Sequence, residues 1–577
     1  MSDSSGSSFV FLSNWKLGLA VSVPCFAVGL CVTFYNYFKT SGNTRLLDKP
    51  TANASIAKEA NVENPPETNG IDQTAFKTKT LVEKVEDLKK LGNAEFLKRN
   101  YDMAITYYTQ AILMCPESKQ AALSVLFQNR AAAYSKLNNN ENCLADCNNA
   151  LALVPRYVKA LSRRARVLSE LGNLKLALED ITAATIFDDY KNQDDVIFSD
   201  NLLKSLGEQN LEEYTKHNAF NLPSKTFINQ FLKSFCDDPF SDEFTMALLK
   251  SDINTGLEYA LKCIQNQKFE EIEKACQEEL NKADNSLIRE SFALNLLATF
   301  YLLRGNYAAG IEHLTTVIEN PNVPNKLIIN SLIKRALIYH QQEEVDKSFE
   351  DFNRAEVIDP NSSAVYHHRA QIYLRGMNTK KAVKDLKKSL ELNSNFDLSI
   401  IYYYFAQYCH AKRVSNANVK HFLIQLGDFV INYPDIPESF TLYTQALLEN
   451  GAYRGADLVL KNALEIHPDQ ADFLVHRALI ASSWKINGIF VAFRFIEQAL
   501  NLDPKCNFAY ETLGALYMRV GQQKDAIDCL EKAIPLPKSR KQLLYTFSLR
   551  NLAQTQLAIV ERFRIMMPNG YTISENQ

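Results

Sequence analysis

Residues Val85–Ser118 read VEDLKKLGNAEFLKRNYDMAITYYTQAILMCPES, and the spacing of small residues within them predicts the architecture of the chain. Gly92, Ala104 and Ala111 stand at positions 8, 20 and 27 of this 34-residue unit, and Pro116 stands at position 32. Small side chains at positions 8 and 20 let two helices of one unit approach closely, and the one at 27 does the same toward the next unit. Pro116 prevents the second helix from continuing. The unit is therefore expected to be a helical hairpin.

The same frame returns along the chain, which is typical of a repeat architecture. Two further units follow at Ser124–Tyr157 and Val158–Asn192. Six more units begin at Ser291, Ile329, Ser363, Pro437, Ala471 and Asn507. The stretches 253–286 and 397–436 fit the frame loosely. This is the tetratricopeptide pattern, and it predicts an all-α superhelical solenoid of about eleven repeats in two segments.

The composition agrees with a helical chain and excludes several function classes. Among 577 residues there are 19 Gly and 18 Pro, fewer than the usual shares of about 7% and 5%, which disfavours turn-rich β architectures. The 63 Lys and Arg nearly balance the 66 Asp and Glu, so no chain-wide surface for nucleic acid is expected. The eleven cysteines contain no Cys-x-x-Cys pair and no His cluster has metal-ligand spacing, so neither a metal nor a cofactor is predicted.

The N-terminus predicts a membrane anchor. Leu17–Tyr35 is a stretch of 19 residues without a charge, close to the ~20 residues that span a bilayer. We assign 1–16 to a short N-terminal segment and 17–38 to a transmembrane helix rather than to a signal peptide, because no clear small-x-small cleavage site follows. More Lys and Arg follow the stretch than precede it, which places the bulk of the chain in the cytosol. Residues 39–80 are polar and are expected to form a flexible linker.

One face of the first helix in each repeat predicts a binding groove. Positions 2, 5, 6 and 9 cluster on the side that stacked repeats turn into a concave wall. In the first three repeats these positions include Lys89, Asn93, Asn129, Lys159 and Arg163. All five side chains donate hydrogen bonds and none is a carboxylate. The set predicts a dicarboxylate clamp for the C-terminus of a polypeptide that ends in Asp, and further positive charge is expected from Arg156, Arg164 and Arg166.

The same face of the later repeats is mixed in character. It predicts a second groove formed by Phe292, Asn295, Leu296, Ile333, Leu337, His367, His368, Gln371, His476 and Phe508. A loose amphipathic wall suits varied peptide segments, although packing between segments is an alternative for any one of these residues. Adjacent side chains diverge on a helix, so His367 and His368 are expected to be polar groove residues rather than metal ligands.

These features divide the chain into domains. Residues 81–192 are expected to form the clamp domain with three repeats, and 193–252 a connecting segment in which the frame is lost. Residues 253–540 are expected to form a C-terminal domain with about eight repeats, and 541–577 a capping helix and tail. Anchor, linker and repeats leave no room for a catalytic domain, and no Gly-rich phosphate loop or hydrolase elbow occurs. The chain is therefore not expected to be an enzyme.

The five donor positions resemble the dicarboxylate clamp of co-chaperone tetratricopeptide domains, which bind the C-terminal Glu-Glu-Val-Asp of cytosolic heat-shock chaperones. The whole layout, with stretches such as Gln128–Ala133 and Asp503–Glu511, resembles the tetratricopeptide receptors of the mitochondrial outer-membrane translocase in animals. The connecting segment lacks the strongly charged insertion of some members, and no function is assigned to it.

The resemblance implies a non-enzymatic, single-pass import receptor on the mitochondrial outer membrane, facing the cytosol. Its implied partners are chaperone tails, which dock at the clamp, hydrophobic precursor proteins, which occupy the C-terminal groove, and other translocase subunits, which lead to the pore. The alternative is a membrane-anchored co-chaperone at another organelle such as the endoplasmic reticulum.

Overall fold

The computed structural model describes residues 80–217, 221–236, 238–241, 245, 247, 255–282, 286–414, 418–484, 488–536 and 540–563. The predicted anchor at 17–38, the segment before it, nearly all of the predicted linker and the tail beyond residue 563 lie outside these residues. Within the described ranges, no helix has both the length and the apolar character needed to cross a membrane.

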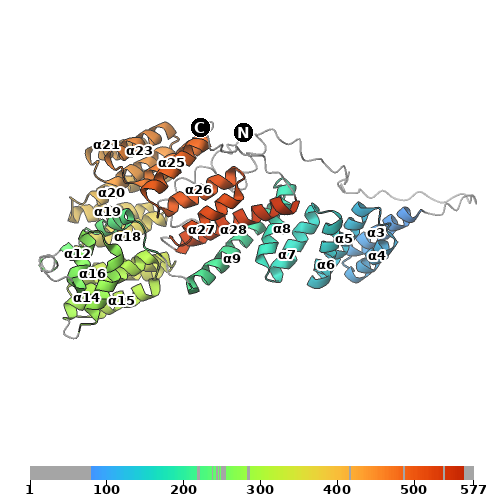
Figure 1. The fold of residues 1–577 in the computed structure, drawn as a ribbon, viewed down its shortest axis with the longest axis horizontal. Coiled ribbons are helices and arrows are strands. Elements are labelled where there is room, and N and C mark those ends of the chain that lie inside the picture. Colours follow the sequence, from blue (N-terminus) through green and yellow to red (C-terminus); the bar gives the residue numbers. More distant parts are fainter. Residues whose placement is uncertain are drawn as a thin grey trace, which may run out of the picture. The chain divides into compact units, whose positions relative to one another are not determined.

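The described residues form α-helices and two short 3-10 helices, which confirms the all-α prediction (Figure 1). The structure divides into two compact units. The N-terminal unit contains described residues 80–205 and 555–563, and the C-terminal unit contains those within 206–554. The first unit thus reaches beyond the predicted clamp domain of 81–192, because it also includes the start of one long helix and the end of another.

Three helix pairs form the body of the N-terminal unit. They are α3 (Leu81–Leu97) with α4 (Tyr101–Met114), α5 (Gln120–Lys136) with α6 (Asn140–Leu153), and α7 (Val158–Glu170) with α8 (Leu174–Phe187). Helix α9 (Gln193–His217) starts in this unit and ends in the other.

Small residues bring the paired helices together, as the frame predicts. Ala104 and Ala111 are fully buried. A Cβ atom on Gly92 would lie 2.6 Å from the Tyr108 ring, closer than such atoms approach in a packed core. Glycine at position 8 therefore lets Tyr108 pack directly on α3.

A recurring ion pair that the sequence analysis missed joins the two helices of four repeats. In each pair Nε and Nη2 of an Arg at position 7 donate to the two carboxylate oxygens of an Asp 16 residues later. The pairs are Arg130–Asp146, Arg164–Asp180, Arg335–Asp351 and Arg369–Asp385. Such bidentate pairs combine charge with fixed geometry, and both partners are largely buried here.

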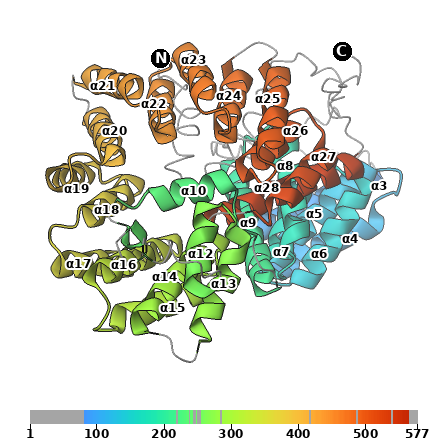
Figure 2. The same cartoon turned by 60° about the vertical axis from the view of Figure 1, so that its left-hand side comes forward.

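The C-terminal unit contains eight successive helix pairs (Figures 1 and 2). The first four are α12 (Gly256–Gln265) and α13 (Ile272–Leu280), α14 (Leu287–Arg304) and α15 (Tyr307–Glu319), α16 (Asn325–Gln341) and α17 (Val345–Ile358), and α18 (Ser363–Arg375) and α19 (Thr379–Leu392). The last four are α20 (Asp397–Arg413) and α21 (Val419–Asn432), α22 (Pro437–Glu449) and α23 (Tyr453–Ile466), α24 (Ala471–Trp484) and α25 (Gly488–Leu502), and α26 (Asn507–Arg519) and α27 (Gln523–Ala533).

These repeats curve until their ends meet. Lys505 Nζ, just before α26, lies 3.2 Å from Glu270 Oε1, 235 residues earlier. Lys541 forms a 3.0 Å ion pair with Glu343. Surface ion pairs of this kind contribute little energy, but their geometry shows that the superhelix of this unit returns on itself and encloses its concave side.

The helix predicted to cap the last repeat is α28 (Arg540–Phe563), and it serves both units. Its first part packs Leu543 and Phe547 against Ile534, directly after α27, and against Leu211 of α9. Its last residues belong to the N-terminal unit, where Ile559 and other apolar side chains pack on α7 and α8. The prediction of a simple cap therefore describes only the first part of this helix.

Candidate functional site

The five predicted clamp residues lie on the first helices of the three N-terminal pairs. Lys89 and Asn93 are on α3, Asn129 is on α5, and Lys159 and Arg163 are on α7. Asn93 and Lys159 are exposed, and the other three are partly buried. Two hydrogen bonds link the helices along this wall: Asn129 Nδ2 donates to Asn93 Oδ1 at 3.2 Å, and Arg163 Nη1 donates to a carbonyl of α5 at 3.2 Å.

The orientation of the Asn93 amide follows from its neighbours. Tyr108 donates its hydroxyl to Asn93 Oδ1 at 2.8 Å, and Asn129 donates to the same oxygen. Because both donors occupy the oxygen, the Nδ2 group of Asn93 is the part of the amide left to meet a ligand. Burial raises the pKa of Tyr108 to about 12, so its hydroxyl keeps its proton at neutral pH. Gly92 makes this arrangement possible, since it admits the Tyr108 ring beside α3.

A cavity of about 230 Å³ opens beside these amides. Its lining residues are Asn93, Phe96, Leu97, Tyr108, Asn129 and Ala132. The amides supply polar groups and the other residues supply mostly apolar surface. A terminal residue that carries a carboxylate and an aliphatic neighbour suits such a combination.

The positive charge of this wall comes from fewer residues than the sequence suggests. Arg164 is held by its buried pair with Asp180, and Arg166 pairs with Asp195 at 2.7 Å. Arg156 donates to the carbonyl of Phe563 and lies over the ring of Phe187. The expectation that these arginines add charge to the groove is therefore wrong for Arg164 and Arg166, whose charges are paired with buried carboxylates, whereas Arg156 keeps its charge because its partners are a carbonyl and a ring.

The other positive charges of this wall belong to the predicted clamp. Lys89 pairs with Glu86 at 2.7 Å, but an exposed pair one turn apart is weak and readily exchanged for a ligand. Neither Lys159 nor Arg163 forms an ion pair with any residue that the structure describes. The wall thus presents three cations and two amides, and these are donors with which two nearby carboxylates could form charged hydrogen bonds.

The ten residues predicted for the second groove lie on α14, α16, α18, α24 and α26. Leu337 and Gln371 are partly buried, and the other eight are buried. The structure brings part of this set together: His367 Nε2 lies 3.0 Å from Gln371 Nε2, and the rings of His476 and Phe508 meet edge to face. The expectation of an open wall is not met. Two causes bury this wall: neighbouring repeats pack on some of its residues, such as His367 against Phe396 and Tyr402, and another segment of the same protein covers part of α14, α16 and α18.

The covering segment is the part of 193–252 that follows α9. It contains α10 (Lys225–Lys233) and η2 (Pro239–Ser241). Figure 2 shows α10 inside the curve traced by α16, α18 and α20. The ring of Phe235 lies 4.6 Å from that of His368, and the ring of Phe240 lies 5.5 Å from that of Phe292.

A buried lysine at one of the groove-facing repeat positions lies between the wall and this segment. Lys334 donates to Asn295 Oδ1 at 2.8 Å, and its ammonium lies 5.3 Å from the centre of the Phe235 ring and 5.5 Å from that of Phe240. Burial lowers the pKa of Lys334 to about 8, and nearby Asp238 opposes that shift. Position 6 of its repeat, which also holds Asn129 and Arg163 in the N-terminal unit, is the sequence signal for this residue.

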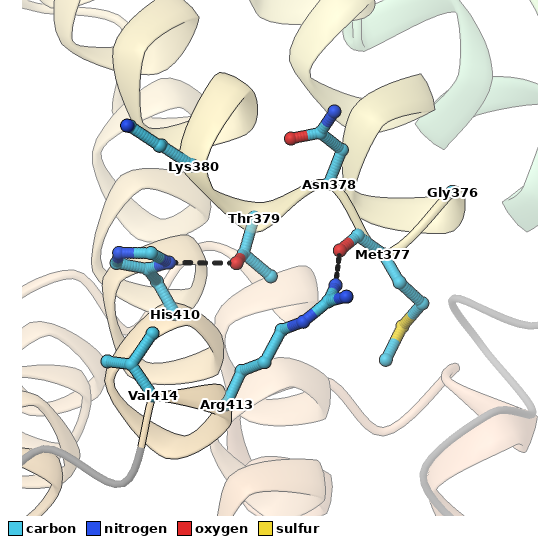
Figure 3. A pocket seen from close by; sticks show the side chains of 8 residues that line it. All are labelled: Gly376, Met377, Asn378, Thr379, Lys380, His410, Arg413 and Val414. Carbon is cyan, nitrogen blue, oxygen red and sulfur yellow. Dashed lines mark hydrogen bonds between the residues drawn. The ribbon is translucent and has the colours of Figure 1, made fainter.

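A second cavity, of about 360 Å³, lies where the turn between α18 and α19 meets the end of α20 (Figure 3). Its polar groups bond to one another: Thr379 Oγ1 lies 3.0 Å from His410 Nδ1, and Arg413 donates to the carbonyl of Met377. These bonds join neighbouring repeats, and we assign the cavity no ligand.

The chain is similar to a repeat family, to mitochondrial import receptors and to a solved structure of one such receptor. A family model described as tetratricopeptide repeat matches residues 363–396. The chain is 33% identical over 500 residues to the mitochondrial import receptor subunit TOM70 of Rattus norvegicus, which covers 84% of this chain and 81% of that protein. It is 31% identical over 580 residues to the same subunit of Homo sapiens, covering 96% and 94%. The crystal structure of yeast Tom70 matches with a TM-score of 0.48 at 21% identity, covering 82% of this chain and 96% of that one.

Proposed function

The chain belongs to the TOM70 family of mitochondrial import receptors, which are not enzymes. We propose that its N-terminal groove docks the C-terminal tails of cytosolic heat-shock chaperones. The observation that carries this proposal is the linked set of donors on three successive helices, with the Asn93 amide oriented by Tyr108 and Asn129. Two carboxylates at the end of an acidic peptide match these donors. Each charged hydrogen bond contributes about 1.5–3 kcal/mol.

The C-terminal groove receives hydrophobic precursor proteins in this proposal. Its wall mixes apolar side chains with polar ones such as Asn295 and Lys334, which suits segments of varied sequence. The receptor then passes the precursor to the pore through other translocase subunits. The segment 17–38 anchors the chain in the mitochondrial outer membrane with its bulk facing the cytosol, and imaging of the tagged full-length chain tests that location. The similarity to mitochondrial receptors favours this location over the endoplasmic reticulum.

A titration with a labelled peptide that ends in Glu-Glu-Val-Asp tests the clamp. We expect the full chain to bind this peptide and to bind the same peptide with an amidated C-terminus at least about tenfold more weakly, because one carboxylate is lost. Equal affinity for the two peptides would contradict a dicarboxylate clamp.

A further inference from the structure

We infer that residues Leu222–Phe240 are an internal ligand of the C-terminal groove, which an incoming precursor segment displaces. This inference rests on the proposed function of that groove. It assigns a role to the connecting segment and also describes the kind of segment that the groove accepts.

Contacts at several described residues of the segment hold it in the groove. Gln230 Nε2 donates to Gln470 Oε1, 240 residues away, at 3.0 Å. Cys236 Sγ lies 3.2 Å from Ser363 Oγ, at the start of α18. Leu222, Ile228 and Phe235 are buried in the same apolar cluster as the walls of α14, α16 and α18.

The segment has the sequence of an amphipathic peptide ligand. Phe227 and Phe231 lie one turn apart on α10, so they share one face of that helix, and Phe235 follows directly after the helix ends. Phe227 and Phe231 pack against the apolar cluster, and Phe231 and Phe235 contact each other with ring centres 5.5 Å apart. Lys225 and Lys233 are exposed. Helices that bind in grooves use this division between an anchoring face and a solvated face.

The wall beneath the segment is unlike a permanent core. Asn295, Lys334, His367 and His368 are all buried there, although such residues are seldom fully buried in proteins. Asn295, Lys334 and His367 bond to neighbouring side chains, but both ring nitrogens of His368 are buried without a hydrogen-bond partner among the described residues. The burial of His368 is therefore costly, and that cost falls when the groove opens to water. A wall of this kind suits a surface that is alternately covered and exposed.

Detachment of the segment does not require the repeats to unfold. Helix α10 has nine residues, and an isolated helix of that length is marginal in water, so it is held by the groove rather than by its own bonds. The recurring Arg–Asp pairs of α16 with α17 and of α18 with α19 lie within the repeats and do not involve the segment. The wall can therefore persist when the segment leaves.

These contacts also describe the external ligand. We expect it to be a helical segment with two aromatic side chains four residues apart, in place of Phe227 and Phe231, followed after the helix by an aromatic residue in place of Phe235. An acidic residue shortly after the aromatic ones would take the place of Asp238, whose charge acts on Lys334.

A crosslink that locks the segment tests the inference. In the full chain with Ser363→Cys, copper phenanthroline should oxidise the new thiol and that of Cys236 to a disulfide, because the two positions are already in contact. Peptide mapping identifies the bond. One probe is a labelled peptide with the sequence of residues 222–240 in which Cys236 is replaced by Ser. The other is a labelled hydrophobic membrane-protein precursor. The unaltered protein, treated in parallel, controls for oxidation of the other cysteines.

We expect both probes to bind the reduced variant, to bind the oxidised variant at least about tenfold more weakly, and to recover on reduction. Equal binding to the locked and reduced protein would overturn the inference while leaving the groove as a precursor site. If the precursor binds neither state, the proposed function of the groove is itself wrong.

A second variant tests the same competition without a crosslink. Phe235→Ala removes the ring contact with His368 from the internal ligand and leaves the wall unchanged. Because an aromatic pair contributes modestly beyond its buried area, we expect the precursor to bind about three- to tenfold more tightly. Unchanged or weaker binding would contradict competition by this segment.

Discussion

The same repeat builds two grooves whose walls differ in exposure. In the N-terminal unit, buried residues of α5 alternate with partly exposed ones, and Asn129 is accessible. In the C-terminal unit, all residues from 327 to 336 of α16 are buried, including Lys334 at the same repeat position. Packing between repeats buries most of α16, and the segment after α9 adds to this at Lys334, where Phe235 and Phe240 lie over the ammonium. The repeat frame thus fixes which side chains face the groove, while packing between repeats and the connecting segment together determine whether water reaches them.

Acid should affect the two units in opposite directions. Burial lowers the pKa of His368 to about 3 and that of His367 well below its usual value. As the pH falls below about 6.5, these two histidines therefore bind protons in the unfolded state but not in the folded state. Each of them lowers the free energy of unfolding of the C-terminal unit by roughly 1.4 kcal/mol at about pH 5.5. The described residues of the N-terminal unit contain no histidine, and burial raises the pKa of Asp200 to about 7. Because Asp200 binds its proton in the folded state before it does in the unfolded state, this unit gains stability as the pH falls from 7 to 5.5.

Segment-resolved hydrogen exchange at pH 7 and 5.5, corrected for the intrinsic rate, measures this difference. Faster exchange in α18 with unchanged or slower exchange in α7 is the expected pattern. His368→Phe keeps an aromatic ring against Phe235 and should reduce the acid effect in α18, whereas equal responses in both units would contradict these protonation states.

Replacing Arg163 by Ala should strongly weaken binding of the Glu-Glu-Val-Asp peptide. The change removes a charged donor, worth about 1.5–3 kcal/mol, or roughly 10- to 150-fold in Kd. Arg166→Ala on the same helix is the matched control, because Arg166 pairs with Asp195, and its Kd should stay within about twofold. Binding of the hydrophobic precursor should not change in either variant, and similar losses of peptide affinity in both would argue against a specific clamp.

Gly92→Ala should damage the N-terminal groove without touching its charges. The added Cβ meets the Tyr108 ring at 2.6 Å, so the ring must move and Asn93 loses its hydroxyl partner; we expect about 1–2 kcal/mol of destabilisation and weaker peptide binding. Gly455→Ala, in α23, is the control, since its Cβ meets nothing closer than 3.9 Å and helical Gly→Ala changes are often favourable. Urea unfolding of both variants distinguishes them, and equal stabilities would contradict the role of Gly92.

Added salt should lower the affinity of the peptide for the N-terminal groove more than that of the precursor for the C-terminal groove. We expect this effect to be the smallest of those predicted here. The Debye length falls from about 30 Å to about 10 Å between 0.01 and 0.1 M salt, so the Glu-Glu-Val-Asp peptide should lose affinity several-fold. The precursor groove, whose contacts are largely apolar, should change less. A titration series for both ligands measures the slopes, and parallel slopes would remove this distinction.

Much of the fold and of the first site could be predicted from sequence because repeat positions carry local information. Gly92, Ala104 and Ala111 predicted the helix packing, and the frame aligned the five clamp donors on one wall. The predictions for Arg164 and Arg166 were wrong because both pair with carboxylates, although an Asp 16 residues after Arg164 is a readable signal for a structural pair. The cover on the second groove could not be predicted, because it depends on contacts such as Gln230 with Gln470, 240 residues apart.

The most direct test of this contrast is to titrate both ligands against the oxidised, full-length Ser363→Cys protein. With the internal segment locked, the Glu-Glu-Val-Asp peptide should bind as it does to the reduced protein, while the precursor should lose affinity at least about tenfold. Unchanged binding of both ligands, or loss of both, would contradict this account. In it the two grooves are separate, and the connecting segment occupies only the C-terminal groove.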